Sequence, residues 1–151
     1  DPQLHGQGFV ARLSGSTAEF VHIWLNMNTG NSPFSVNGKG ELTLTLKPAL
    51  AEWLFTKKKT TIDVRNNRGE WKSFDVPKNA YAFNFLGGTT VVYHNPKRKN
   101  TFGQNGAKIK NIKLCYIDDA QLVELNGATI KMPYSMDIRD RKIERMDVYF
   151  E

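Results

Sequence analysis

Short segments in which apolar and polar residues alternate, each bounded by turn-forming residues, cover most of this 151-residue chain. Alternation with a period of two is typical of β-strands that bury one face, and a short turn between two such segments is typical of a hairpin. The segments that show the pattern are 41–47, 60–65, 71–76, 81–86, 89–95, 109–117, 121–125 and 143–150.

Turn signals separate three pairs of these segments, at Asn66–Gly69, at Gly87–Gly88 and at Asp118–Ala120. Consecutive hairpins require antiparallel pairing, and strands with one apolar face require a second layer to cover that face. The sequence therefore predicts an all-β fold, an antiparallel β-sandwich of jelly-roll type with roughly eight or nine short strands.

Residues 1–30 carry a different pattern, which predicts one α-helix. Ser16 and Glu19 fit a capping box at its start, and Gly30 fits its end. Four apolar residues share one helical face at spacings of three and four: Phe20, Ile23, Trp24 and Met27. We predict that this N-terminal segment packs on the outside of a β-sandwich domain of residues 31–151, giving one compact domain.

The sequence lacks the common catalytic and metal-binding motifs. The single cysteine, Cys115, excludes an internal disulfide and a cysteine-based zinc site, and the three histidines lack short metal-ligand spacing. No phosphate-binding loop, nucleophile elbow or dinucleotide fingerprint occurs. We therefore predict that the chain is not an enzyme and that it holds no metal and no cofactor.

The start of the chain shows no recognisable targeting signal. No apolar run is long enough to cross a bilayer, and no signal segment follows Asp1–Gln3. We interpret the chain as a mature or excised fragment. Its localisation is unknown, and a secreted or cell-surface location is favoured if it binds polysaccharide.

The chain is basic, with 21 lysines and arginines against 15 acidic residues, a net charge of +6 and a pI of about 9.5. A net positive charge of this size is typical of proteins that bind nucleic acid. The charges are scattered, however, and the densest groups, 57–59 and 97–99, lie beside turn residues. Nucleic-acid binding is therefore kept as an alternative function only.

Trp71 is the main candidate for ligand contact. In the strand 71–76, Phe74 and Val76 should point inward, which places Trp71 outward. An exposed indole can stack against the C–H face of a sugar ring while neighbouring polar groups bond its hydroxyls. Asn66, Asn67, Arg68 and Asp75 are such neighbours. The alternative is that Trp71 lies against a loop or a missing domain.

A second polar cluster is expected at the end of the strand 89–95. Tyr93, His94, Asn95 and Arg98 bring aromatic, planar and cationic groups together, which suits sugar hydroxyls or an anion. A solvated strand end would show the same composition. Trp53 is expected to close one end of the sandwich.

Residues 4–55 resemble the C-terminal region of glycoside phosphorylases of the cellobiose phosphorylase type. The resemblance rests on Gly15–Glu19 with the following helix, on Gly40–Leu44 and on Leu46–Phe55. It implies a closing β-sandwich behind the last helix of an upstream (α/α)6 catalytic barrel. It also implies that Gln7 and Ser14–Thr17 match a phosphate-holding stretch, and that the general acid lies outside this chain.

The sequence thus predicts a non-catalytic carbohydrate-binding module that recognises a polysaccharide of β-glucan or xylan type. The proposed ligand-binding residues are Trp71, Tyr93, His94, Asn95 and Arg98. The expected partners are a polysaccharide or oligosaccharide and a catalytic domain upstream in the parent chain, with no membrane. The alternatives are a structural cap of a carbohydrate-active enzyme, with Trp71 and the helix at the interdomain contact, and a nucleic-acid-binding domain.

Overall fold

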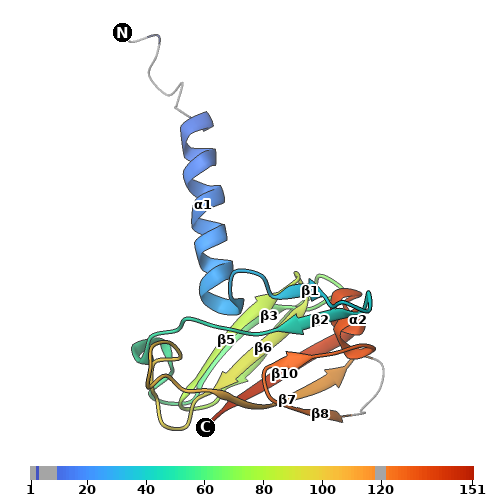
Figure 1. Cartoon of the computed structure of the whole chain (residues 1–151). Helices are drawn as coiled ribbons and strands as arrows, with labels where there is room; N and C mark the ends of the chain where they lie inside the picture. The colour runs from blue at the N-terminus through green and yellow to red at the C-terminus, as the bar shows by residue number, and fades with distance from the viewer. Residues whose placement is uncertain (1–2, 4–9, 118–121) are drawn as a thin grey trace.

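The computed structural model describes residues 3, 10–117 and 122–151. A five-stranded sheet with the strand order β5-β6-β10-β7-β8 forms its centre (Figure 1). Two predicted strand pairs, β5 with β6 and β7 with β8, are antiparallel neighbours in this sheet. The turn expected at Asp118–Ala120 lies outside the described residues. In sheet order the strands are Ala80–Phe85, Thr89–His94, Ile143–Phe150, Ile109–Tyr116 and Leu122–Asn126.

The pairing in this sheet is not purely antiparallel, which corrects the prediction. Strand β10 runs antiparallel to β7 but parallel to β6. Two strands joined by a tight turn must be antiparallel, whereas strands joined by a long connection can run either way. A long stretch of chain separates β6 from β10, so no turn fixed their relative direction.

Two smaller sheets cover the faces of the central sheet. Strands β1 (Phe34–Val36), β2 (Leu42–Thr45) and β9 (Thr129–Ile130) form one of them, with the order β1-β2-β9. The hairpin of β3 (Thr60–Arg65) and β4 (Trp71–Val76) forms the other. The prediction of a mostly β protein built from layered sheets is confirmed, but the jelly-roll connectivity is not.

The main core lies between the central sheet and the β1-β2-β9 sheet. Leu44, Leu46 and Ile130 enclose it from the smaller sheet, and they belong to one cluster with the inward residues of β5, β6, β7 and β10. Under the β3-β4 hairpin, Val76 packs in a separate, smaller cluster with Ala80 and Val92. Because side chains alternate along β6, Val92 faces the hairpin while its neighbours face the main core.

Helix α1 (Val10–Thr29) begins before the predicted cap, so Ser16 lies inside the helix rather than at its start. The predicted end is confirmed, because Gly30 has a φ of 94° and its N–H donates to the carbonyl of Asn26. Figure 1 shows α1 projecting from the sheets, with only its C-terminal end against them. The 3₁₀ turn η2 (Glu52–Leu54) fits the compact, single-turn helical segment that residues 48–55 suggest, whereas helix α2 (Tyr134–Arg139) was not predicted.

The apolar stripe of α1 is only half used by the core. Trp24 and Met27 pack against the main cluster, with Trp24 in an edge contact with Phe83 at 5.7 Å between ring centroids. Phe20 and Ile23 on the same stripe are 69% and 64% exposed. The expectation that the whole stripe packs on the sandwich is therefore wrong, because the outer half of the helix extends beyond the edge of the sheets (Figure 1).

Candidate functional site

The β3-β4 hairpin places Trp71 as the sequence predicts, with its side chain 70% exposed. Trp71 stands directly opposite Arg65 across the hairpin, and Asp75 on the same face bonds Thr61 and Lys59. Arg65 itself donates from Nε to the carbonyl of Gly69. This face therefore offers an open indole beside polar groups that already hold one another in place.

The turn residues expected around Trp71 mainly hold the turn itself. The Oδ1 atom of Asn66 accepts the backbone N–H groups of Arg68 and Glu70, both at 2.9 Å. Asn67 donates from Nδ2 to the carbonyl of Arg141 at 3.0 Å, which ties the turn to the chain before β10. Asn66 thus bonds within its own turn, and Asn67 bonds the chain that leads into β10.

The structure contradicts the second predicted cluster for Tyr93 and Asn95. Tyr93 is fully buried and its hydroxyl donates to the carbonyl of Asn28 at 2.7 Å. Asn95 is 1% exposed, and its side chain bonds both the N–H and the carbonyl of Lys99. Both side chains therefore stabilise the fold and leave no surface for a sugar.

His94 and Arg98 also lie apart from each other. Arg98 donates from Nη2 to the carbonyl of Phe55 at 3.1 Å, which fixes the chain after η2. The His94 ring lies on the opposite side of β6 from Tyr93, 4.5 Å from the ring of Tyr149 and parallel to it within 10°. The four predicted residues do not form one binding surface, because alternation along β6 separates them and two of them close loops.

His94 belongs instead to a polar network on the face of the central sheet opposite the main core. The Oδ1 atom of Asp147 lies 2.7 Å from His94 Nε2 and 2.7 Å from Arg145 Nη2. Burial by itself raises the pKa of Asp147, but the hydrogen bonds from His94 and Arg145 outweigh it and hold the pKa below its usual range. The carboxylate is therefore held in its charged form, with Oδ1 bonded by both neighbours.

A large apolar surface, which we call the α1 face, lies beside the projecting helix. Its most exposed members are Phe20, Ile23, Trp53 and Phe102, and Trp53 is 73% exposed. The prediction that Trp53 closes one end of the sandwich is therefore wrong. A cavity of about 360 Å³ opens between α1, η2 and the loop around Phe102. All of its lining residues are apolar: Phe20, Ile23, Trp24, Met27, Ala49, Ala51, Trp53, Leu54 and Phe102.

Sequence reasoning missed the α1 face, although two signals pointed to it. Phe102 is an aromatic residue inside the polar loop 95–108, where nothing in the sequence offers it a core. Trp53 follows a short apolar run that has no strand periodicity. Only the tertiary structure brings these two side chains next to the helix.

In the described part of the chain, no group of three or more His, Cys, Asp or Glu side chains is arranged to hold a metal ion. Among the described helices, none is long and apolar enough to span a membrane. No protein-family model matches this chain, and no curated protein sequence matches it.

Proposed function

We propose that this chain is a non-catalytic accessory domain of a carbohydrate-active protein, and that it docks onto a second folded domain through the α1 face. The exposure of Phe20, Ile23 and Trp53 is the single observation that supports this most. Burying apolar surface lowers the free energy by about 25 cal/mol for each Å² removed from water. A contiguous apolar patch of this kind is typical of an interaction site.

The carbohydrate-active part of the proposal depends on the sequence resemblance. Its motifs lie in α1, in β2 and in the segment Leu46–Phe55. Of these, α1 and the segment Leu46–Phe55 contribute residues to the α1 face. The resemblance implies that the equivalent helix in glycoside phosphorylases of this type is the last helix of the (α/α)6 catalytic barrel, which would bring the rest of that barrel against α1.

The first prediction concerns the contribution of the α1 face to stability. Replacing Phe20 and Ile23 together by serine should leave the melting temperature of the isolated chain nearly unchanged, because changes at exposed sites usually stay within about ±0.5 kcal/mol. Binding of a hydrophobic dye such as ANS should fall strongly. Trp24→Ser is the control, since Trp24 packs against Phe83 and its loss should lower the melting temperature.

Docking itself is tested by hydrogen exchange of the α1 amides. In the isolated chain the amides of 18–25 should exchange much faster than those of β10. In the natural full-length protein, we expect the same amides to be strongly protected from hydrogen exchange. Equal exchange in the two proteins would contradict docking through α1.

A second function, carbohydrate binding on Trp71, is supported by the exposure of that side chain on the hairpin. Affinity electrophoresis in gels containing β-glucan or xylan should retard the chain, with affinity of roughly micromolar to millimolar. Trp71→Ala should abolish the retardation with the melting temperature unchanged. Trp53→Ala removes an equally exposed indole and should leave the retardation intact.

Two results would argue against stacking on Trp71. Retardation by polysaccharide that survives Trp71→Ala would place the sugar elsewhere. Binding that collapses as salt is raised would favour nucleic acid, because phosphate contacts release counterions whereas sugar hydroxyls do not.

A further inference from the structure

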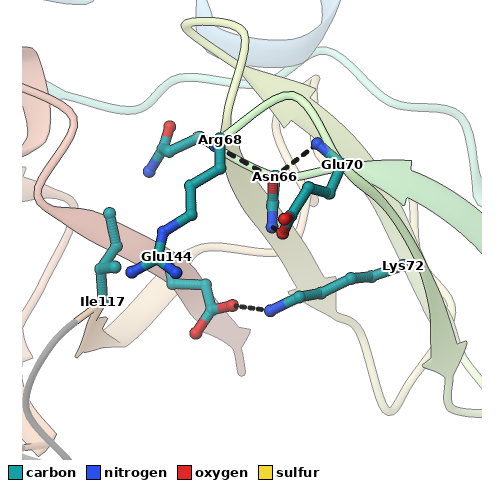
Figure 2. Close-up of a pocket in the computed structure, with 7 residues that line it drawn as sticks. Asn66, Arg68, Glu70, Lys72, Ile117 and Glu144 are labelled. Atoms are coloured by element: carbon teal, nitrogen blue, oxygen red, sulfur yellow. Dashed lines mark hydrogen bonds and ion pairs between the residues drawn. The ribbon is translucent and has the colours of Figure 1, made fainter.

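A crevice separates the β3-β4 hairpin from β10 and β7, and Figure 2 shows its entrance. It consists of two adjoining cavities of about 150 and 270 Å³ that share Asn66, Lys72 and Glu144. Together they reach the lower limit of roughly 300 Å³ for a small-molecule site. We call it the hairpin crevice and define it by Asn66, Lys72, Phe74, Cys115, Glu144 and Arg145.

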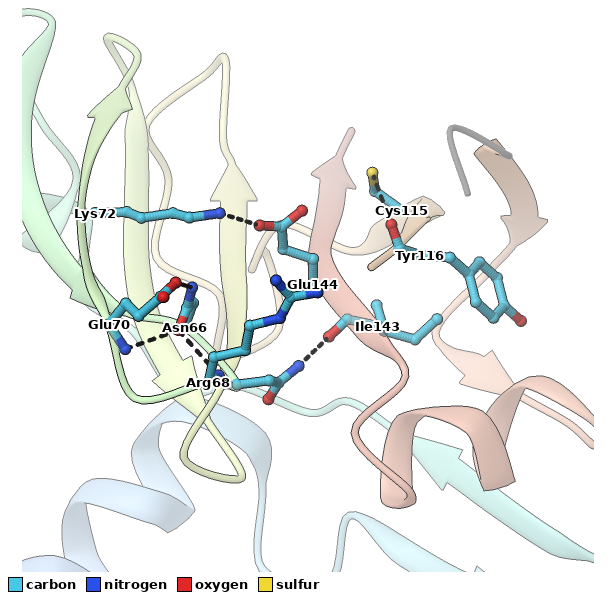
Figure 3. Close-up of polar contacts among 9 residues, drawn as sticks. Asn66, Arg68, Glu70, Lys72, Cys115, Tyr116, Ile143 and Glu144 are labelled. Carbon is cyan, nitrogen blue, oxygen red and sulfur yellow. Dashed lines mark hydrogen bonds and ion pairs between the residues drawn. The ribbon is translucent and has the colours of Figure 1, made fainter. Parts of the chain in front are cut away.

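One ion pair spans the crevice. Lys72 Nζ on β4 lies 3.1 Å from Glu144 Oε1 on β10, and both side chains remain about half exposed. Figure 3 shows this bridge between the two walls, with Cys115 beyond it on β7. Arg68 reaches across the entrance towards Glu144 and Ile117 (Figure 2). The polar walls therefore carry both signs of charge.

The deeper cavity also has an apolar wall. The ring of Phe74 lines it, and the guanidinium of Arg145 lies over that ring at 5.0 Å. Val64 extends the same wall. Because Arg145 covers a face of the Phe74 ring, Val64 and the remaining part of Phe74 form the apolar surface of the cavity, and the charged side chains around it suit hydrogen bonds.

Two buried polar atoms at the crevice have no hydrogen-bond partner in the described part of the chain. They are the Nε atom of Arg145, which can only donate, and the Oδ1 atom of Asn67, which can only accept. Buried polar atoms of this kind are rare in folded proteins and call for an explanation. Both atoms are closed off from solvent, and Asn67 Oδ1 lies against Gly88, so they mark how tightly the hairpin packs on the central sheet.

From these observations we propose that the hairpin crevice binds one ring of a neutral saccharide. A hydroxyl group can donate to Glu144 and accept from Lys72 or Arg145, as a mixed set of charges requires. The lining carries three cationic side chains, Arg68, Lys72 and Arg145, and two carboxylates, Glu70 and Glu144, so it presents both donors and acceptors. A neutral polyhydroxyl ring can bond both kinds of group, because each hydroxyl donates one hydrogen bond and accepts others.

This site is separate from the two functions proposed above. Trp71 has the opposite parity to Lys72 and Phe74 in β4 and lines neither cavity. The α1 face shares no residue with the crevice. Each of the three proposals can therefore fail without the others.

Cys115 provides a reporter inside the crevice, because it is the only cysteine in the chain and its half-buried side chain lines the deeper cavity. The experiment follows its alkylation by iodoacetamide with and without cellotetraose, laminaritetraose or xylotetraose. At a saccharide concentration about ten times the dissociation constant, occupancy of the crevice should slow alkylation about tenfold.

Two variants and one matched control connect this protection to the crevice. Lys72→Met and Glu144→Gln should each weaken saccharide binding roughly tenfold or more, since each removes a charged hydrogen-bonding group. Lys59→Met is the control, because Lys59 forms an ion pair with Asp75 on the same hairpin but lines neither cavity. In Lys59→Met, the saccharide should protect Cys115 from alkylation as strongly as it does in the unmodified chain.

Several outcomes would overturn the proposal. They are alkylation that none of the three saccharides slows, protection that is unchanged in Lys72→Met and Glu144→Gln, and a Cys115 that does not react in the absence of saccharide. Retardation by polysaccharide without protection of Cys115 would overturn the crevice and leave stacking on Trp71 intact. Protection that persists in Trp71→Ala would support the crevice as an independent site.

Discussion

Replacing Tyr93 by alanine should lower the free energy of unfolding by about 3–5 kcal/mol, the cost expected when a large buried aromatic side chain is removed. Tyr93 is fully buried, with ring centroids 5.7 Å from Phe83 and 5.5 Å from Phe150. Its removal leaves a cavity between β5, β6 and β10. Urea unfolding followed by tryptophan fluorescence measures the effect.

Tyr93→Phe separates the hydroxyl from the ring. This variant should lose only about 1 kcal/mol, because the packing stays and the buried carbonyl of Asn28 loses its donor. Burial also raises the pKa of Tyr93, so the hydroxyl stays protonated and able to donate at neutral pH. A Tyr93→Ala variant with unchanged stability but abolished saccharide binding would return Tyr93 to the role that the sequence suggested.

The second large effect is expected at Asp147. Asp147→Asn removes the negative charge that faces His94 and Arg145 and should lower the free energy of unfolding by about 2 kcal/mol. We place the cost in the lower part of the range for charged hydrogen bonds because the Arg145 side chain is 40% exposed and water screens it. Asp63→Asn, at an exposed aspartate on the hairpin, is the matched control.

The sign of the pH dependence follows from the lowered pKa of Asp147 in the folded state. A carboxyl group with a depressed folded pKa contributes stability above its unfolded pKa, about 3.9 for aspartate, and loses that contribution as the pH falls through the folded value. The stability difference between the unmodified chain and Asp147→Asn should therefore be full at about pH 5 and shrink at lower pH. A difference that stays constant down to about pH 2 would contradict the assigned charge.

The strands were the predictable part of this fold. The segments 60–65, 71–76 and 143–150 coincide with β3, β4 and β10, because alternation over six to eight residues and a strong turn signal are both local properties. Strands β1 and β9 were missed, since elements of three and two residues carry no measurable period. The start of α1 was also misplaced, because a capping motif inside a helix has the same sequence as one at its end.

The sequence predicted a candidate site correctly only where the orientation of a single side chain was sufficient. The parity of Trp71 within β4 was enough to place it outside, and it is outside. The predicted cluster from Tyr93 to Arg98 is wrong because neighbouring residues in a strand face opposite sides. In addition, the side chains of Asn95 and Arg98 donate hydrogen bonds to backbone carbonyls in loops. Chain proximity by itself therefore did not imply a shared surface.

The sequence alone determined that this chain is mostly β, that a helix precedes the strands and ends at Gly30, and that Trp71 is exposed, since each of these depends on residues within one turn or strand. The tertiary structure alone decided that β10 lies between β6 and β7, that Phe20 is left outside the core, and that Lys72 and Glu144 face each other across a crevice. These features join segments that are far apart in the chain. Their positions follow from how whole layers pack, which no local pattern encodes.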